Sequence, residues 1–176
     1  MSYMELKKMV NFFYSMNYDD EIPEETGDET RPPISLLQLH ARMFALGDRY
    51  DIPGLRDMAV KKYSSRATVP GVPLELLESI YDVYKGTPAS VRQLRDAAGI
   101  LVRKSLPKML DEAAVATAYE KVLDEVPEFT KELLGIYVKA ALYGECYTCG
   151  SNQGMEALQV RCMRCGKGRS GVSGVY

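Results

Sequence analysis

All four cysteines of this 176-residue chain lie between positions 146 and 165, in two pairs with the same internal spacing. The pairs are Cys146-x2-Cys149 and Cys162-x2-Cys165, and twelve residues separate them. A two-residue gap lets both thiolates of a pair reach one ion from a single tight turn, and two such turns complete a tetrahedral shell. Because cysteine fills all four coordination positions, the metal would be structural rather than catalytic. We therefore predict one structural zinc ion, bound by these four cysteines.

Residues 144–176 form a module whose composition differs from that of the preceding chain. Helix-forming residues give way to Cys, Gly, Ser and Thr, and one run, residues 157–161, alternates like a strand. A glycine follows the second cysteine of each pair, at Gly150 and Gly166, which suits the sharp turn of a zinc knuckle. A module of fewer than about 40 residues folds only with its metal bound. Iron in the same four-sulfur shell and a pair of disulfides remain alternatives to zinc.

Before residue 144 the apolar residues recur at helical spacing, which predicts a mainly α fold. Glycine or proline marks the junctions between the periodic segments. Helices are expected from the N-terminus to about residue 17, and then over 36–49, 53–65, 74–86, 88–102, 106–110, 113–123 and 127–144. Ser35, Asp51 and Thr87 are the expected N-caps, and Gly86 is an expected C-cap. The short turn before Pro53 requires the second and third helices to pack against each other.

The first of these helices is apolar on more than one face. Tyr3, Leu6, Met9 or Val10, Phe13 and Asn17 follow one stripe, whereas Met4, Phe12, Tyr14 and Met16 lie on other faces. A helix with several apolar faces needs neighbours on several sides. We expect apolar surface to be exposed around Phe12, Phe13 and Tyr14.

Two polar segments divide the chain. Residues 18–33 hold a run of aspartates and glutamates with no basic residue before Arg31, together with three prolines and a glycine. This composition predicts a solvated acidic loop, with an acidic docking site as the alternative. A linker with two prolines and a glycine follows at residues 67–73. The chain thus divides into residues 1–66, a helical extension over residues 74–143 and the cysteine module.

Composition excludes several classes of enzyme. The chain has one histidine, His40, so a site that needs two histidines cannot be built. His40 lies on the apolar stripe of its helix between Leu37 and Phe44, which predicts a core residue. The sequence has no phosphate-binding glycine loop or nucleophile elbow, and the cysteines are assigned to metal. We therefore predict a protein without enzymatic activity.

The charge pattern bears on partners and location. The net charge is only −2, so no overall field would draw the chain to nucleic acid or to anionic lipid. Charged residues interrupt the first turn, and no uncharged apolar stretch of about 18 residues occurs, which argues against a signal peptide and a membrane helix. We expect an intracellular protein, in the cytoplasm or the nucleus, with no membrane partner. In such a reducing compartment, clustered thiols are more often metal ligands than disulfides.

Two segments carry a more specific pattern, LKKMVNFFYSMNY over residues 6–18 and LLQLHARMFALGDRYDIPGL over residues 36–55. Together they resemble the second half of a BTB/POZ domain, of the type abundant in filamentous fungi. The most specific piece is DRYDIPGL, residues 48–55, and residues 74–143 more loosely resemble the helical region that follows in that family. Gly47 stands where the family usually has alanine, a change that weakens a helix by about 1 kcal/mol.

The resemblance implies a protein–protein interaction module. Members of the family form homodimers and bind cullin scaffolds, so this chain would be a substrate adaptor for a cullin-RING ubiquitin ligase. The family's strands, its first helices and most of its dimer interface would precede Met1. We therefore expect a homodimer only if the first half of the BTB/POZ domain is also present.

The cysteine module suggests an alternative function. Its basic residues Arg161, Arg164, Lys167 and Arg169 outnumber its acidic residues Glu145 and Glu156, a local balance of +2. A zinc ribbon of this kind on a helical scaffold would bind nucleic acid or act in transcription. Binding that weakens steeply with salt would favour this alternative.

Overall fold

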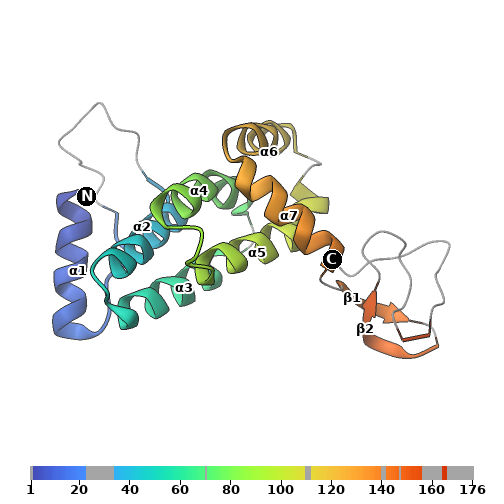
Figure 1. Cartoon of the computed structure of the whole chain (residues 1–176), viewed down its shortest axis with the longest axis horizontal. Helices are drawn as coiled ribbons and strands as arrows, with labels where there is room; N and C mark the ends of the chain where they lie inside the picture. The colour runs from blue at the N-terminus through green and yellow to red at the C-terminus, as the bar shows by residue number, and fades with distance from the viewer. Residues whose placement is uncertain are drawn as a thin grey trace.

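The chain forms an array of helices with a small hairpin near its C-terminal end (Figure 1). A computed structural model describes residues 2–22, 34–69, 71–109, 112–139, 142–146, 148–155 and 164–165. These residues form seven α-helices and one two-stranded antiparallel sheet, so the prediction of a mainly α fold is confirmed. The elements are α1 (Tyr3–Ser15), α2 (Leu36–Arg49), α3 (Pro53–Ala67), α4 (Pro73–Gly86), α5 (Gln93–Met109), α6 (Ala113–Glu125), α7 (Pro127–Lys139), β1 (Leu142–Cys146) and β2 (Gly150–Met155).

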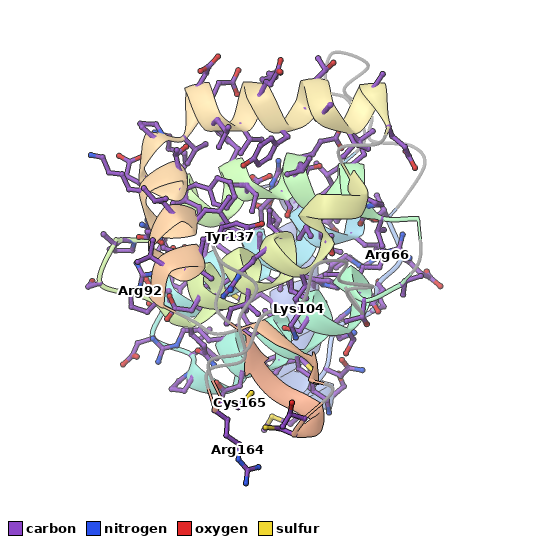
Figure 2. All side chains as sticks on the ribbon, turned by 90° about the vertical axis from the view of Figure 1, so that its right-hand side faces the viewer. Arg66, Arg92, Lys104, Tyr137, Arg164 and Cys165 are labelled. Atoms are coloured by element: carbon purple, nitrogen blue, oxygen red, sulfur yellow. The ribbon has the colours of Figure 1, made fainter. Side chains whose placement is uncertain are left out.

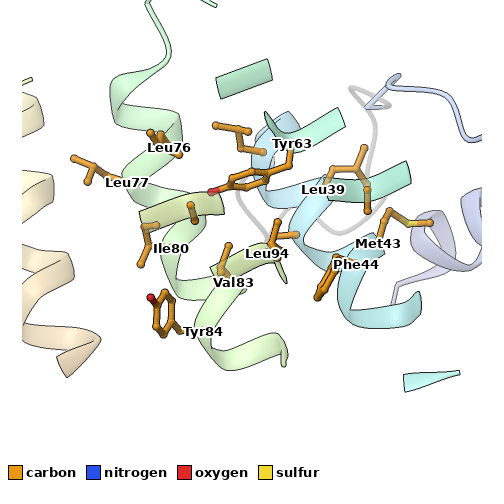
Figure 3. Packing of buried hydrophobic residues seen from close by; sticks show 14 of the residues in the cluster. Leu39, Met43, Phe44, Tyr63, Leu76, Leu77, Ile80, Val83, Tyr84 and Leu94 are labelled. Atoms are coloured by element: carbon orange, nitrogen blue, oxygen red, sulfur yellow. The ribbon is translucent and has the colours of Figure 1, made fainter. Parts of the chain in front are cut away.

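The hydrophobic core is built around α2, α3, α4 and α5. Phe44 of α2, Ile80 of α4 and Leu94 of α5 are fully buried and belong to one cluster (Figure 3). Tyr63 of α3 lies in the same cluster, and its hydroxyl is 2.7 Å from the Ser79 hydroxyl, which satisfies both buried groups. The predicted packing of α2 against α3 is confirmed.

A capping box begins α2, as predicted from Ser35. The Ser35 hydroxyl accepts the Gln38 N–H at 3.2 Å, and the Gln38 side chain accepts the Ser35 N–H at 2.9 Å. Glu75 in the first turn of α4 accepts the Leu37 N–H at 2.9 Å through one carboxylate oxygen. Its other oxygen accepts Nε and Nη2 of Arg66, at 3.2 and 2.9 Å. Glu75 thus joins α2, α3 and α4 at one end of the core.

Gly47 allows a close approach between α2 and α3. A Cβ atom at this position would lie 3.0 Å from the backbone nitrogen of Arg56 and 3.3 Å from the carbonyl oxygen of Ile52. The predicted N-cap Asp51 is wrong, because Ile52 occupies the N-cap position and makes no side-chain cap. Asp51 instead adopts a left-handed φ of 50°, a conformation that aspartate tolerates better than most residues and that turns the chain between the helices.

The start of α5 differs from the prediction, because the chain does not become helical at Pro88. Thr87 is therefore not the N-cap of α5, and its hydroxyl donates to the Val83 carbonyl in the last turn of α4 at 3.1 Å. Arg95 donates to the carbonyl oxygens of Tyr84 and Thr87 at 2.9 and 2.7 Å. These tertiary hydrogen bonds hold the loop between α4 and α5 in a non-helical path.

Three other helix boundaries also differ from the prediction. Gly86 is the last residue of α4 and not its C-cap. The short helix predicted over 106–110 is part of α5, which runs unbroken to Met109. The last helix ends at Lys139 rather than Gly144, because residues 142–146 form β1, which pairs with β2. The strand-like run 157–161 lies outside the described residues.

In the overall arrangement, α1 lies at one end of the molecule and the β1–β2 hairpin lies at the other (Figure 1). The predicted acidic loop over 18–33 falls within the description only as far as Ile22. No helix in the described part of the chain has both the length and the apolar character needed to cross a membrane.

Candidate functional site

One face of α1 is packed against the rest of the molecule. Phe12 is only 5% exposed, and its ring lies close to Gly54 at the start of α3, where a Cβ atom would be 3.2 Å from Phe12 Cζ. Met9 is also buried, and a capping box between Ser2 and Glu5 fixes the first turn. The expectation that Phe12 is exposed is therefore wrong, because the ring fills the space above a glycine.

The opposite face of α1 carries apolar side chains that are exposed. We call Tyr3, Leu6, Val10, Phe13 and Tyr14, together with Met16 at the C-cap of α1, the α1 outer face. Their exposure ranges from 37% for Leu6 to 89% for Tyr14, so the predicted exposure of Phe13 and Tyr14 is confirmed. Single exposed apolar residues are ordinary, but several on one helix form a patch of the kind that binds a partner.

A cavity of about 280 Å³ lies where α1, α2 and α4 meet. Its lining residues are Ser2, Glu5, Arg42, Ala45, Leu46, Arg49, Asp82 and Gly86. Arg42 Nη1 is 3.6 Å from the Glu5 carboxylate, and Arg42 Nε donates to Asp82 at 2.9 Å. Arg42 therefore compensates both acidic side chains of the cavity and connects the three helices. Arg49 is exposed and forms no ion pair with any described residue.

Two lysines hold the segment that follows α1. Buried Lys8 donates to the Asp19 carboxylate, and this hydrogen bond lowers the pKa of Asp19. Lys62 of α3 donates to the Tyr18 carbonyl at 2.7 Å, and its Nζ is 4.7 Å from the centre of the Tyr18 ring. The segment therefore stabilises α1 in its position on α2 and α3.

His40 is a buried core residue, as predicted. Its Nδ1 is 2.9 Å from the hydroxyl of Tyr18, which is also buried. Burial lowers the pKa of His40 to about 4, so the imidazole is neutral at pH 7. Its hydrogen bond joins α2 to the segment after α1, which is a structural role.

Two arginines of α5 are buried against α7 and the α4–α5 loop. Arg95 uses its guanidinium to donate to two backbone carbonyls and stacks on the Tyr84 ring at 4.6 Å. Arg103 donates once, to the Ile136 carbonyl at 2.9 Å, and lies 5.2 Å from the centre of the Tyr137 ring. Nε and Nη2 of Arg103 are buried and lack a hydrogen-bond partner among the described residues, and desolvation lowers the pKa of this arginine.

The first cysteine pair lies at the turn of the β-hairpin. Cys146 ends β1, Cys149 lies in the turn, and Gly150 begins β2 opposite Cys146. The expected tight turn at this pair is therefore present. In the second pair, Cys165 lies in another turn beside exposed Arg164 (Figure 2), and Cys162 lies outside the described residues.

The donor set of four cysteines suits zinc, although the described residues do not include a complete site. Within the described part of the chain, no three His, Cys, Asp or Glu side chains are grouped so that they could hold a metal ion. Cys162 lies outside the described residues, so this statement does not concern the complete cysteine set. The zinc ion stays a prediction.

Sequence reasoning identified the apolar character of α1 but missed the charged groups that fix it. The Ser2-x-x-Glu5 pattern is a capping-box signature and could have been found. The partners of Lys8 and Lys62 could not, because they depend on the path of the segment after α1. Comparisons with protein-family models, with curated proteins and with solved structures each give no match.

Proposed function

We propose that this chain is a non-enzymatic protein–protein interaction module that binds its partner through the α1 outer face. The observation that carries the proposal is a helix with two different apolar faces, one packed around Phe12 and the other exposed around Phe13. The capping box and the Glu5–Arg42 and Lys8–Asp19 pairs hold this helix before a partner arrives. A surface that is already ordered loses little entropy on binding, which favours affinity.

The finer proposal is that the module is of BTB/POZ type. It is supported by the order of the elements, because α1, an acidic connection and the α2–α3 pair follow one another as the resemblance implies. The partner class that the resemblance implies is the scaffold of a cullin-RING ubiquitin ligase. On this proposal the chain would bring a substrate to that scaffold.

We propose further that the C-terminal module holds one structural zinc ion through Cys146, Cys149, Cys162 and Cys165. The hairpin turn at the first pair supports this proposal, because it brings the backbone of Cys146 and Gly150 opposite each other. Bound zinc would supply a rigid crosslink between the two turns.

A second candidate function is nucleic-acid binding by this module. The observation that favours it is the exposed side chain of Arg164 next to Cys165 (Figure 2). Binding of RNA or DNA that falls steeply with salt and is lost on replacing Arg161, Arg164 and Arg169 would support this candidate. Salt-independent binding would contradict it.

Site-specific photo-crosslinking tests the main proposal in cells. A photo-reactive amino acid at Phe13 is expected to give discrete adducts with a protein partner. The same amino acid at Lys131, an exposed position on α7, is the control and is expected to give none. Purified cullin scaffold is then tested for binding to the full chain and to the Phe13→Glu variant. Equal adducts from both positions would contradict the α1 outer face as the binding surface, and adducts without cullin binding would contradict only the finer proposal.

A further inference from the structure

The spacing of the α1 outer face points to the shape of its partner. Tyr3, Leu6, Val10 and Phe13 are separated by three, four and three residues. This is the alternation of a and d positions in a coiled coil, in which each apolar side chain inserts between residues of a facing helix. An extended peptide would instead present side chains at a period of two. The α1 outer face therefore fits an α-helix that lies along it.

The charged residues beside the α1 outer face indicate which charge the partner helix should carry. Lys7 directly follows Leu6, is exposed, and forms no ion pair with any described residue. The other charged residues of α1, Glu5 and Lys8, are buried and paired. Lys7 is thus a cation beside the α1 outer face that forms no ion pair within the described part of the chain, and a complementary helix would carry acidic residues.

A second copy of the chain is a poorer fit to this surface. The α1 of a second copy exposes no carboxylate, because Glu5, its one acidic residue, is buried against Arg42. Two α1 outer faces brought together would therefore place two Lys7 side chains at the edges of the interface without a carboxylate of α1 to pair with them. Such unpaired charge disfavours self-association relative to a partner with complementary charge.

We infer that the partner presents an amphipathic α-helix, apolar at heptad spacing and acidic along one flank, that packs along the α1 outer face with its carboxylates near Lys7. This inference rests on the proposed function and names the chemistry of its partner. It assigns separate roles to two kinds of residue: the apolar residues of the α1 outer face contribute burial, and Lys7 selects the partner by charge.

The test uses two designed helical peptides as probes and the full chain as the receptor. Both peptides span about three heptads with leucine at a and d, and they differ only in glutamate or lysine at e and g. Fluorescence anisotropy at low salt is expected to give at least about tenfold tighter binding for the glutamate peptide. Val10→Ser is expected to weaken binding of that peptide, because the stripe loses a central apolar side chain.

A charge reversal provides the decisive comparison. Lys7→Glu is expected to abolish or invert the preference between the two peptides, and Lys131→Glu on α7 is the matched control that leaves it unchanged. Circular dichroism checks that both variants keep their helical content. Equal binding of the two peptides, or a preference that Lys7→Glu does not change, would overturn the acidic-helix inference.

Two further outcomes separate this inference from the proposed function. If neither peptide binds while crosslinking from Phe13 still gives adducts, the helical partner is wrong and the interaction surface stands. If both measurements fail, both proposals are overturned. A dimer seen by light scattering and dissociated by Val10→Glu would show that a second copy occupies the face, and this would also overturn the inference.

Discussion

At the scale of single residues, Arg95 and Arg103 show how differently two buried cations of one helix can be accommodated. Arg95 has backbone carbonyls as acceptors and lies 3.9 Å from the Glu132 carboxylate. Among the described residues, Arg103 has one carbonyl acceptor, in the last turn of α7, where the negative end of the helix dipole favours a cation. A buried charge with few partners costs desolvation energy that its contacts do not fully repay.

The two arginines are therefore expected to respond differently to replacement by methionine. Arg95→Met should lower the free energy of unfolding by about 2 kcal/mol or more, because two buried carbonyls lose their donors. Arg103→Met should change it by less than about 1 kcal/mol, because removal of an incompletely paired buried charge offsets one lost hydrogen bond. Urea unfolding followed by circular dichroism measures both values. An equal loss of unfolding free energy in the two variants would contradict the conclusion that Arg95 is better paired than Arg103.

His40 makes the stability of the fold depend on pH. Its pKa of about 4 in the folded chain lies below the ordinary value of 6.5, so the unfolded chain binds the proton more readily. The free energy of unfolding is therefore expected to fall by about 1 kcal/mol per pH unit as the pH drops from 6.5 towards 4. Since the chain has one histidine, His40→Gln should remove most of this slope between pH 7 and pH 5. An unchanged slope in urea titrations of the variant would contradict the assignment to His40.

At the scale of elements, local signals predicted the helices well and their ends less well. The capping residue Ser35 and the apolar periodicity placed α2 correctly, because both signals act within a few residues. The start of α5 was wrong because Arg95 binds the carbonyl groups of the preceding loop, a contact between distant groups that outweighs the local preference of Thr87 and Pro88. The cysteine module was predicted as a β-turn or ribbon module, but β1 and β2 were not placed, because both strands are short and contain glycine, which hides the strand pattern.

Two helical glycines are expected to respond to alanine with opposite signs. Gly47→Ala should destabilise the fold by about 1 kcal/mol or more, because the new Cβ would lie 3.0 Å from the Arg56 backbone nitrogen. Gly135→Ala in α7 should stabilise it by about 0.5–1 kcal/mol, because no atom lies within 4 Å of the new Cβ and alanine favours the helix. Thermal unfolding of both variants gives the two signs. A stabilising Gly47→Ala would contradict the close approach of α2 and α3.

At the scale of the whole molecule, we expect two parts that are stabilised in different ways, the helical part by its apolar core and the cysteine module by zinc. The described core extends from Met9 to Leu133 and contains no residue of the cysteine module. Sequence reasoning could predict the outer face of α1 from its excess of apolar residues, and the cysteine set from its spacing. It could not predict which of the neighbouring Phe12 and Phe13 is buried, because that depends on the space above Gly54 in another helix.

Removal of zinc should therefore affect the two parts separately. The purified chain is expected to contain one zinc ion per molecule by elemental analysis, and a chelator or the Cys162→Ser variant should release it. The amides of the cysteine module should then lose protection from hydrogen exchange, whereas those of α2 and α4 keep it, because their core is apolar and contains no metal ligand. Thr148→Ser, within the first cysteine turn but outside the ligand set, is the control that keeps the metal. Iron in place of zinc, intact thiols without metal, or loss of helical protection on chelation would each contradict this separation.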